Sequence, residues 1–93
     1  MIVLSVTISI RLFDAYSLKE KRSIVKSMLK RLHNRFNVST AEIDSMDMLN
    51  EAIIAIVTVG NQYKICEQVL QQCIKEIEYT YPVEIFQIDW ERE

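Results

Sequence analysis

Residues 2–12 read Ile-Val-Leu-Ser-Val-Thr-Ile-Ser-Ile-Arg-Leu, and this stretch does most to decide the fold. Its even positions all hold large aliphatic side chains, whereas serine, threonine and arginine occupy most of its odd positions. An alternation with a period of two is typical of a β-strand that buries one face and exposes the other. The stretch therefore predicts a strand with one face in a core.

The segment after this strand predicts a long helix. Ser17 and Glu20 have the spacing of a capping box, in which side chains bond to the free backbone N–H groups at the start of a helix. Apolar residues then recur at intervals of three and four as far as Phe36. We expect the first helix to run from about Leu18 to Phe36.

The rest of the chain adds three strands and a second helix. We expect a short strand over Asn37–Ile43, a polar turn over Asp44–Asn50, a strand over Glu51–Val59 that ends at Gly60-Asn61, a helix over Gln62–Thr80 and a last strand over Val83–Trp90. The order βαββαβ predicts an α+β ferredoxin-like sandwich, in which two helices cover one face of a four-stranded antiparallel sheet.

Length and composition narrow the function classes. The chain has 93 residues and 49% of them are hydrophobic, which suffices for one core, so we expect a single domain over residues 1–93. A single glycine excludes a glycine-rich phosphate loop. No stretch approaches the roughly 18 apolar residues that cross a bilayer, and the start does not resemble a signal peptide. We therefore expect a cytoplasmic protein with no membrane contact.

The first helix concentrates the positive charge of the chain. It holds seven of the eleven Lys and Arg residues and a single acid, Glu20, although the net charge of the chain is −2. The seven are Lys19, Lys21, Arg22, Lys26, Lys30, Arg31 and Arg35. Such a helix favours phosphates or an acidic surface, so all seven are candidate nucleic-acid contacts. The alternative is a solvated face that only keeps the protein soluble.

The spacing of these cations places most of them in one row. Lys19, Arg22, Lys26 and Lys30 follow intervals of three and four, and His33 lies one turn further on. The first and third strands contain no aromatic residue, so any RNA would bind through the helix instead of stacking on the sheet.

Two aromatic residues precede the first helix. Phe13 and Tyr16 would either stack on a base at the helix edge or form an apolar plug under the loop, and we expect the plug.

Catalysis, metal binding and a cofactor have no support in the sequence. His33 has no identifiable partner and reads as a surface histidine. Cys66 and Cys73 lie on one helix face roughly 10 Å apart, too far for a disulfide, so we expect buried free thiols. The acids near the hairpin turn, Glu42, Asp44, Asp47 and Glu51, would attract a divalent ion or form a solvated turn, and we expect the turn.

The third strand predicts a contact surface. Its residues are apolar on both faces, so one set of branched side chains must lie on the face of the sheet that the helices leave open. We expect a homodimer through that face, because exposed apolar patches on small proteins usually mark interfaces. The alternative is a monomer in which Ser5, Thr7 and Ser9 dilute the patch.

Three segments of the chain match those of a known family. They are Ser-Leu-Lys-Glu-Lys-Arg at 17–22, Arg-Phe-Asn-Val-Ser at 35–39 with Ala41-Glu42, and Gly60-Asn61. With these, the chain resembles the YlxP-like family of small bacterial proteins of unknown function. The resemblance covers essentially the whole chain, although residues after Asn61 match only in pattern. It implies a ferredoxin-like fold and, through gene neighbourhoods, a link to translation and ribosome maturation.

Together these features predict a non-enzymatic protein. Its first helix would dock on structured RNA or a ribosomal particle, and two copies would pair through the open sheet face. The alternative is a regulatory or ligand-binding homodimer whose sheet face is the functional surface.

Overall fold

The computed structural model describes residues 1–93, and its elements follow the expected order. They are β1 (Ile2–Leu12), α1 (Leu18–Arg35), β2 (Ser39–Asp44), β3 (Glu51–Gly60), α2 (Tyr63–Thr80) and β4 (Val83–Arg92). The predicted boundaries differ by one or two residues. Phe36, for example, has extended dihedral angles and caps α1 by donating its N–H to Leu32 O at 2.9 Å.

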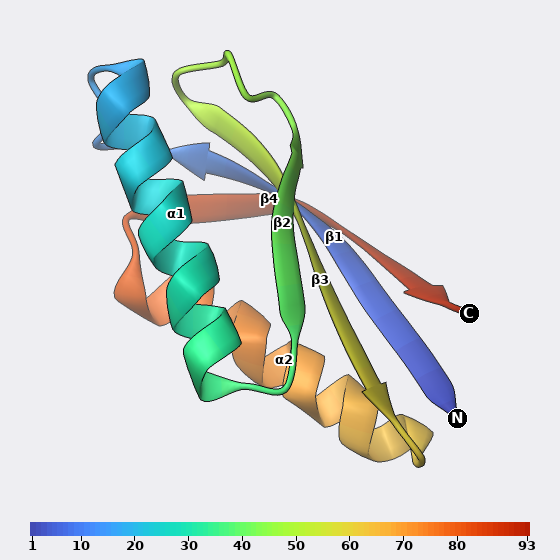
Figure 1. The fold of residues 1–93 in the computed structure, drawn as a ribbon. Coiled ribbons are helices and arrows are strands. Elements are labelled where there is room, and N and C mark those ends of the chain that lie inside the picture. The colour runs from blue at the N-terminus through green and yellow to red at the C-terminus, as the bar shows by residue number, and fades with distance from the viewer.

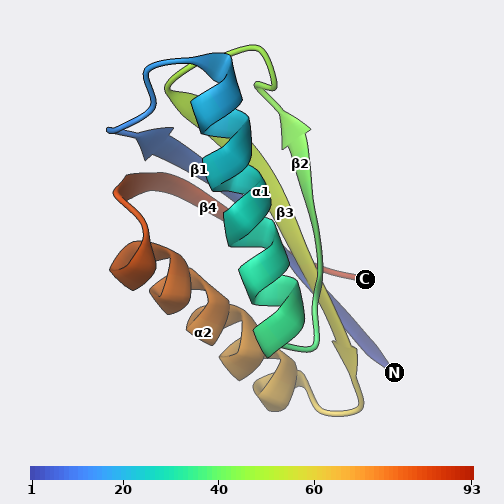
Figure 2. The ribbon, with the colours of Figure 1, turned by 60° about the vertical axis from the view of Figure 1, so that its left-hand side comes forward.

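The four strands form one antiparallel sheet in the order β2-β3-β1-β4. Figures 1 and 2 show both helices on the same side of this sheet, with α1 lying along β2 and α2 crossing β3 and β1. The split βαβ arrangement of a ferredoxin-like fold is therefore confirmed. As a result β2 and β4 are the two edge strands, and α1 stands beside the β2 edge.

The core lies between the sheet and the helices and consists of 17 residues in one cluster. The even-numbered residues of β1 and β3 supply its floor, as the alternation predicts. From α1 come Val25, Met28 and Leu32, and from α2 come Leu70 and Ile77 among others. Since the helix stripes and the strand faces meet here, the other face of the sheet stays uncovered.

Gly60 marks the crowded junction between β3 and α2. Its backbone is not in the left-handed region, so a turn does not require glycine at this position. A Cβ atom here would lie 2.8 Å from the Cys66 Sγ atom, which is buried in the core. Glycine is needed for space, since the first turn of α2 packs directly against the end of β3.

Both edge strands contain an irregularity. The pairing of β2 with β3 shifts between Glu42 and Asp44, and the pairing of β4 with β1 shifts opposite Ser9 and Ile10. Such bulges make an edge a poor template for a further strand. Neither helix is long and apolar enough to span a membrane.

Candidate functional site

The start of α1 is fixed by Ser17 as the predicted N-cap, whereas Glu20 reaches back to Tyr16, one residue before the cap, instead of completing the capping box at Ser17. Ser17 Oγ accepts a hydrogen bond from the Glu20 N–H group at 3.1 Å, and Glu20 Oε2 accepts one from the Tyr16 N–H group at 3.1 Å. The first bond satisfies a free donor at the helix start and the second holds the residue before the cap, so the cations that follow project from a well-defined helix.

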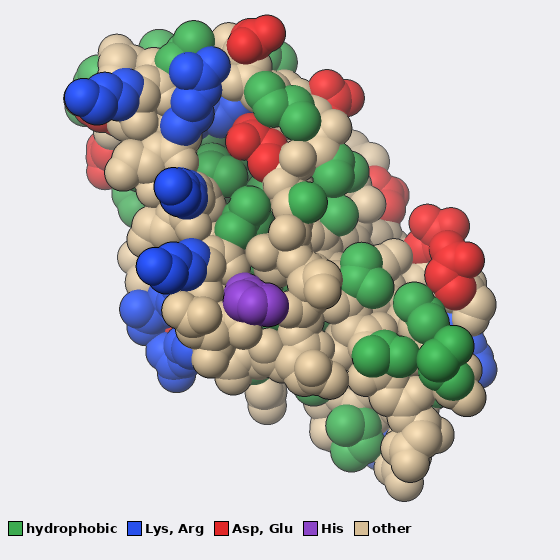
Figure 3. Space-filling view, in the orientation of Figure 1, with side chains coloured by type: hydrophobic (Ala, Val, Ile, Leu, Met, Phe, Trp, Pro, Cys, Tyr) green, Lys and Arg blue, Asp and Glu red, His purple; other side chains and the backbone are tan.

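Four of the seven cations form an exposed row along the outer side of α1, which we call the cationic stripe: Lys19, Arg22, Lys26 and Lys30. Figure 3 shows Lys and Arg side chains spaced down this side of the helix. Three of the four, all lysines, form no ion pair, and Arg22 lies 3.8 Å from Asp47 with both side chains largely in solvent. The stripe therefore presents charge that the protein itself leaves almost uncompensated.

Beside the stripe runs an open groove of about 620 Å³ between α1 and β2. Val25 and Leu29 form its floor, and Arg22, Lys26, Lys30 and His33 line its α1 side. The β2 side consists of Ser39, Thr40 and Glu42, and Thr40 Oγ1 donates a hydrogen bond to Leu29 O at 3.3 Å. In Figure 3 the groove is visible between the Lys and Arg column and β2, with the histidine at its lower end.

Lys21 differs from its neighbours because its side chain is fully buried. Its ammonium group donates a hydrogen bond to Ser45 O and forms an ion pair with Glu42 Oε2 at 3.1 Å, although the angle there does not suit a hydrogen bond. Ser45 itself has a left-handed backbone with φ of 62°. Lys21 thus ties α1 to the β2–β3 turn and has no surface left for a phosphate.

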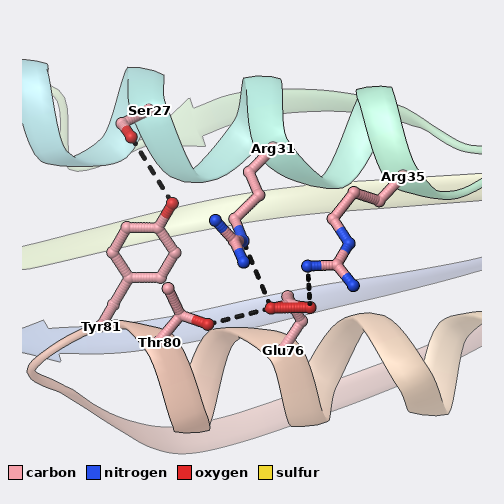
Figure 4. A network of polar contacts seen from close by, with 6 residues as sticks. All are labelled: Ser27, Arg31, Arg35, Glu76, Thr80 and Tyr81. Atoms are coloured by element: carbon pink, nitrogen blue, oxygen red, sulfur yellow. Dashed lines mark hydrogen bonds and ion pairs between the residues drawn. The ribbon is translucent and has the colours of Figure 1, made fainter.

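Arg31 and Arg35 lie on the opposite flank of α1, where one carboxylate of α2 offsets one of their two positive charges. Glu76 accepts contacts from Arg31 Nε and from an Arg35 terminal nitrogen, each at 3.2 Å (Figure 4). A hydrogen bond from Thr80, at 2.9 Å, and then the two guanidinium groups lower the pKa of the Glu76 carboxyl against the opposing effect of its burial. The sequence suggested a helix offset only by Glu20, whereas the structure adds acids from other elements, among them Glu42 and Glu76.

His33 is an exposed residue with a structural contact. Its Nδ1 atom lies 2.9 Å from Val38 O, a hydrogen bond that joins the end of α1 to the turn before β2. No carboxylate or nucleophile pairs with it.

The prediction that Phe13 and Tyr16 plug the loop is wrong. Phe13 is 57% exposed and Tyr16 is 79% exposed. The loop needs no plug because Leu12 N–H bonds to Asn50 O at 2.9 Å and Phe13 N–H bonds to Pro82 O at 3.2 Å. Both aromatic rings therefore lie in solvent near the start of α1.

The two cysteines and the acids near the hairpin turn form no reactive or metal-binding site. Cys66 and Cys73 are buried free thiols, as predicted, and burial, followed by the nearby Glu76 carboxylate, raises the pKa of Cys73 to about 12. That thiol stays protonated and unreactive. The acids near the hairpin turn do not converge, and no three His, Cys, Asp or Glu residues gather at metal-binding range.

The open face of the sheet divides into two halves. Over β1 and β3 this face is neutral. Ile53, Ala55 and Val57 face outward here and are partly buried, whereas Ile54 points the other way and is buried beneath the helices. Over β4 it is acidic, because the register places Glu84, Asp89 and Glu91 on the same side. Arg11 pairs with Glu84 at 2.8 Å and lies over the Phe86 ring at 4.8 Å.

Comparison with known proteins places the chain in a family. Residues 3–90 match the model of a family described as a protein of unknown function, DUF503. The chain belongs to the DUF503 family. It is also similar to the uncharacterized protein YlxP of Bacillus subtilis (strain 168), with 35% identity over 81 residues that cover 85% of this chain and 88% of the relative. The two matches together confirm the resemblance to the YlxP-like family that the sequence predicts.

Proposed function

We propose that this DUF503 protein is a cytoplasmic, non-enzymatic module that docks on structured RNA, free or within a ribosomal particle, through the cationic stripe of α1. The observation that carries the proposal is the separation of charge on the helix. Lys21 is paired with Glu42, and Arg31 and Arg35 share the one carboxylate of Glu76, whereas the three lysines of the stripe have no acidic partner. A helix that needed cations only for solubility would gain nothing from having its paired and unpaired cations on separate sides.

The geometry of the stripe suits a chain of phosphates. Neighbours at intervals of three or four residues on a helix lie about 5 to 6 Å apart, close to the spacing of successive phosphates along one strand. Contacts of this kind set position and affinity without reading sequence. The proposal therefore narrows the seven predicted contacts to Lys19, Arg22, Lys26 and Lys30.

A pair of matched charge reversals tests this assignment. The Lys26→Glu, Lys30→Glu variant removes the middle of the stripe, and the Lys64→Glu, Lys75→Glu variant makes the same change in net charge on α2, where both lysines are exposed and unpaired. Affinity for total ribosomal RNA is measured by filter binding over a salt series. Each phosphate contact contributes a slope of about −0.7 to −0.9 in log affinity against log salt.

We expect the α1 variant to lose binding by at least about tenfold and to lower the salt slope by about two contacts. The α2 variant should bind nearly as the wild type does, and neither variant should change the melting temperature, because all four side chains lie in solvent. Equal losses in the two variants, or no binding by the wild type at low salt, would remove the proposal.

We propose as a second candidate that two copies pair through the neutral half of the open sheet face, making the protein a homodimeric regulatory or ligand-binding module. The observation that favours it is the outward row of Ile53, Ala55, Val57 and Val59 on β3, of which Val59 is 49% exposed. The acidic half over β4 would lie outside such an interface. Pairing through the sheet leaves the cationic stripe free, so this candidate is compatible with the first.

A further inference from the structure

The groove between α1 and β2 has an apolar floor that phosphate binding does not explain. Phosphates need cations and hydrogen-bond donors, and the stripe alone would supply them. Val25 and Leu29 offer neither, yet they line an opening beside three cations. The ligand that fits this groove is therefore anionic along one side and apolar in its body.

The β2 side of the groove adds hydrogen-bonding groups. Thr40 contributes a hydroxyl, which donates to Leu29 O and can still accept a hydrogen bond, and Glu42 contributes the only acid among the lining residues. A carboxylate accepts hydrogen bonds only, so the matching part of the ligand must carry donors. A nucleotide unit has all three features, namely a phosphate on each side, a flat base and donors on the base or on the ribose 2′-OH. A volume of about 620 Å³ also lies in the usual range for small-molecule sites.

An acidic peptide fits less well. It would add a strand to the free edge of β2, but the pairing of β2 shifts after Glu42, which leaves only the segment 39–42 regular. The observations thus favour a nucleotide over a peptide strand.

We infer that the groove receives one unpaired nucleotide of an RNA strand, with its flanking phosphates against Lys26 and Lys30 and its base over Leu29. The inference rests on the proposed RNA docking and adds to it that the protein selects a loop, bulge or single strand over a duplex. Unpaired nucleotides are what such a groove admits, because a base inside a duplex is stacked and cannot enter it.

The wild-type protein tests the inference directly with three probes of about ten nucleotides, assayed by fluorescence anisotropy at one salt concentration. They are a single-stranded RNA, the blunt duplex of the same sequence, and the single strand with abasic sites. If charge alone governed binding, the duplex would bind at least as tightly, since its phosphates are denser. We expect the single strand to bind about tenfold more tightly than either other probe.

Two variants locate the effect in the groove without changing charge. Leu29→Trp fills the floor, and Asn34→Trp places the same ring on the exposed outer side of α1, away from the groove. We expect Leu29→Trp to lose the preference for the single strand but to keep duplex affinity. Asn34→Trp should behave as the wild type. Melting curves check that both variants fold, and the wild-type comparison stands without either of them.

The outcomes distinguish entry of a nucleotide into the groove from RNA docking through the cationic stripe. Equal affinity for the single strand, the duplex and the abasic strand, combined with a loss of all binding in the Lys26→Glu, Lys30→Glu variant, overturns the inference and leaves RNA docking intact. Polyglutamate is also tested as a competitor, at the same concentration of negative charges as the RNA. If it displaces the single strand, the groove is assigned to an acidic peptide and the inference is overturned. Absence of RNA binding at low salt overturns both.

Discussion

Lys21 lies in the same run of cations as Lys19 and Arg22, yet it is the one whose side chain is entirely buried. The residue shares its helix face with Val25, Met28 and Leu32, which follow it at intervals of four, seven and eleven. The sequence held this signal, because the core stripe of α1 extended one turn back includes position 21. The residue type hid this signal, because a lysine beside other lysines is expected to be exposed.

We predict that Lys21→Met lowers the free energy of unfolding by about 3 kcal/mol, because it leaves Glu42 without a partner in a largely buried position. Urea denaturation measures the change. Lys19→Met, at an exposed site of the same helix, should change stability by no more than about 0.5 kcal/mol. A Lys21→Met protein as stable as the wild type would show that the ion pair does not hold the β2–β3 turn.

The groove could not have been found residue by residue. Its α1 side was predictable as a row of cations, but Ser39, Thr40 and Glu42 carry no signal until the fold sets β2 beside α1. Glu42 was identified only as one acid of a polar turn. A groove formed by two elements depends on how they pack, and hydrophobic periodicity reports only which face of each element is buried.

The secondary-structure elements themselves were predictable almost completely. β1 alternates without exception on its buried side, and α1 carries its own capping signal at Ser17. What the sequence did not reveal is how one element compensates another. Glu76 on α2 pairs with both Arg31 and Arg35 on α1, although it lies more than 40 positions away from them in the chain.

The contact between the helices should depend on pH. The pKa of the Glu76 carboxyl is lowered in the folded protein from its usual value of 4.5, so its contribution to stability is fully present above that value. The contribution is lost as the pH falls through the lower, folded-state pKa. We predict that Glu76→Gln is less stable than the wild type at neutral pH and that this difference shrinks as the pH falls below 4.5.

Urea denaturation at a series of pH values measures this convergence. Glu78→Gln is the matched control, since Glu78 is an exposed acid of the same helix and forms no ion pair. Its stability should follow that of the wild type at every pH. A constant gap between Glu76→Gln and the wild type would mean that the contact with α1 does not depend on the charge of Glu76.

At the scale of the whole molecule, a charged substitution in the neutral half of the open sheet face tests the proposed dimer. We predict that Val57→Lys gives a folded monomer, because it places a charge within the outward row of β3, where pairing would bury it. The wild type should sediment as a dimer. Gln71→Lys, which adds the same charge at an exposed position of α2, should leave the dimer unchanged.

Analytical ultracentrifugation measures the masses, and circular dichroism checks that the fold is kept. A wild type that sediments at the mass of one chain would end the dimer proposal. The sequence foresaw that one set of β3 residues would face outward, but only the structure decides that Val57 belongs to that set and Ile54 to the core. Both positions are equally apolar, and only the register with β1 distinguishes them.

The acidic strand β4 and the cationic stripe lie at opposite edges of the same sheet, since β4 is one edge and α1 stands over the other. The molecule is consequently an electric dipole directed across its strands. The electric field of a polyanion would rotate an approaching protein molecule until its α1 edge faces the polyanion, before any contact forms. The proposed docking on RNA therefore predicts that added salt slows the rate of encounter much more than it speeds release, because the arrangement of charge acts on the approach as well as on the contact.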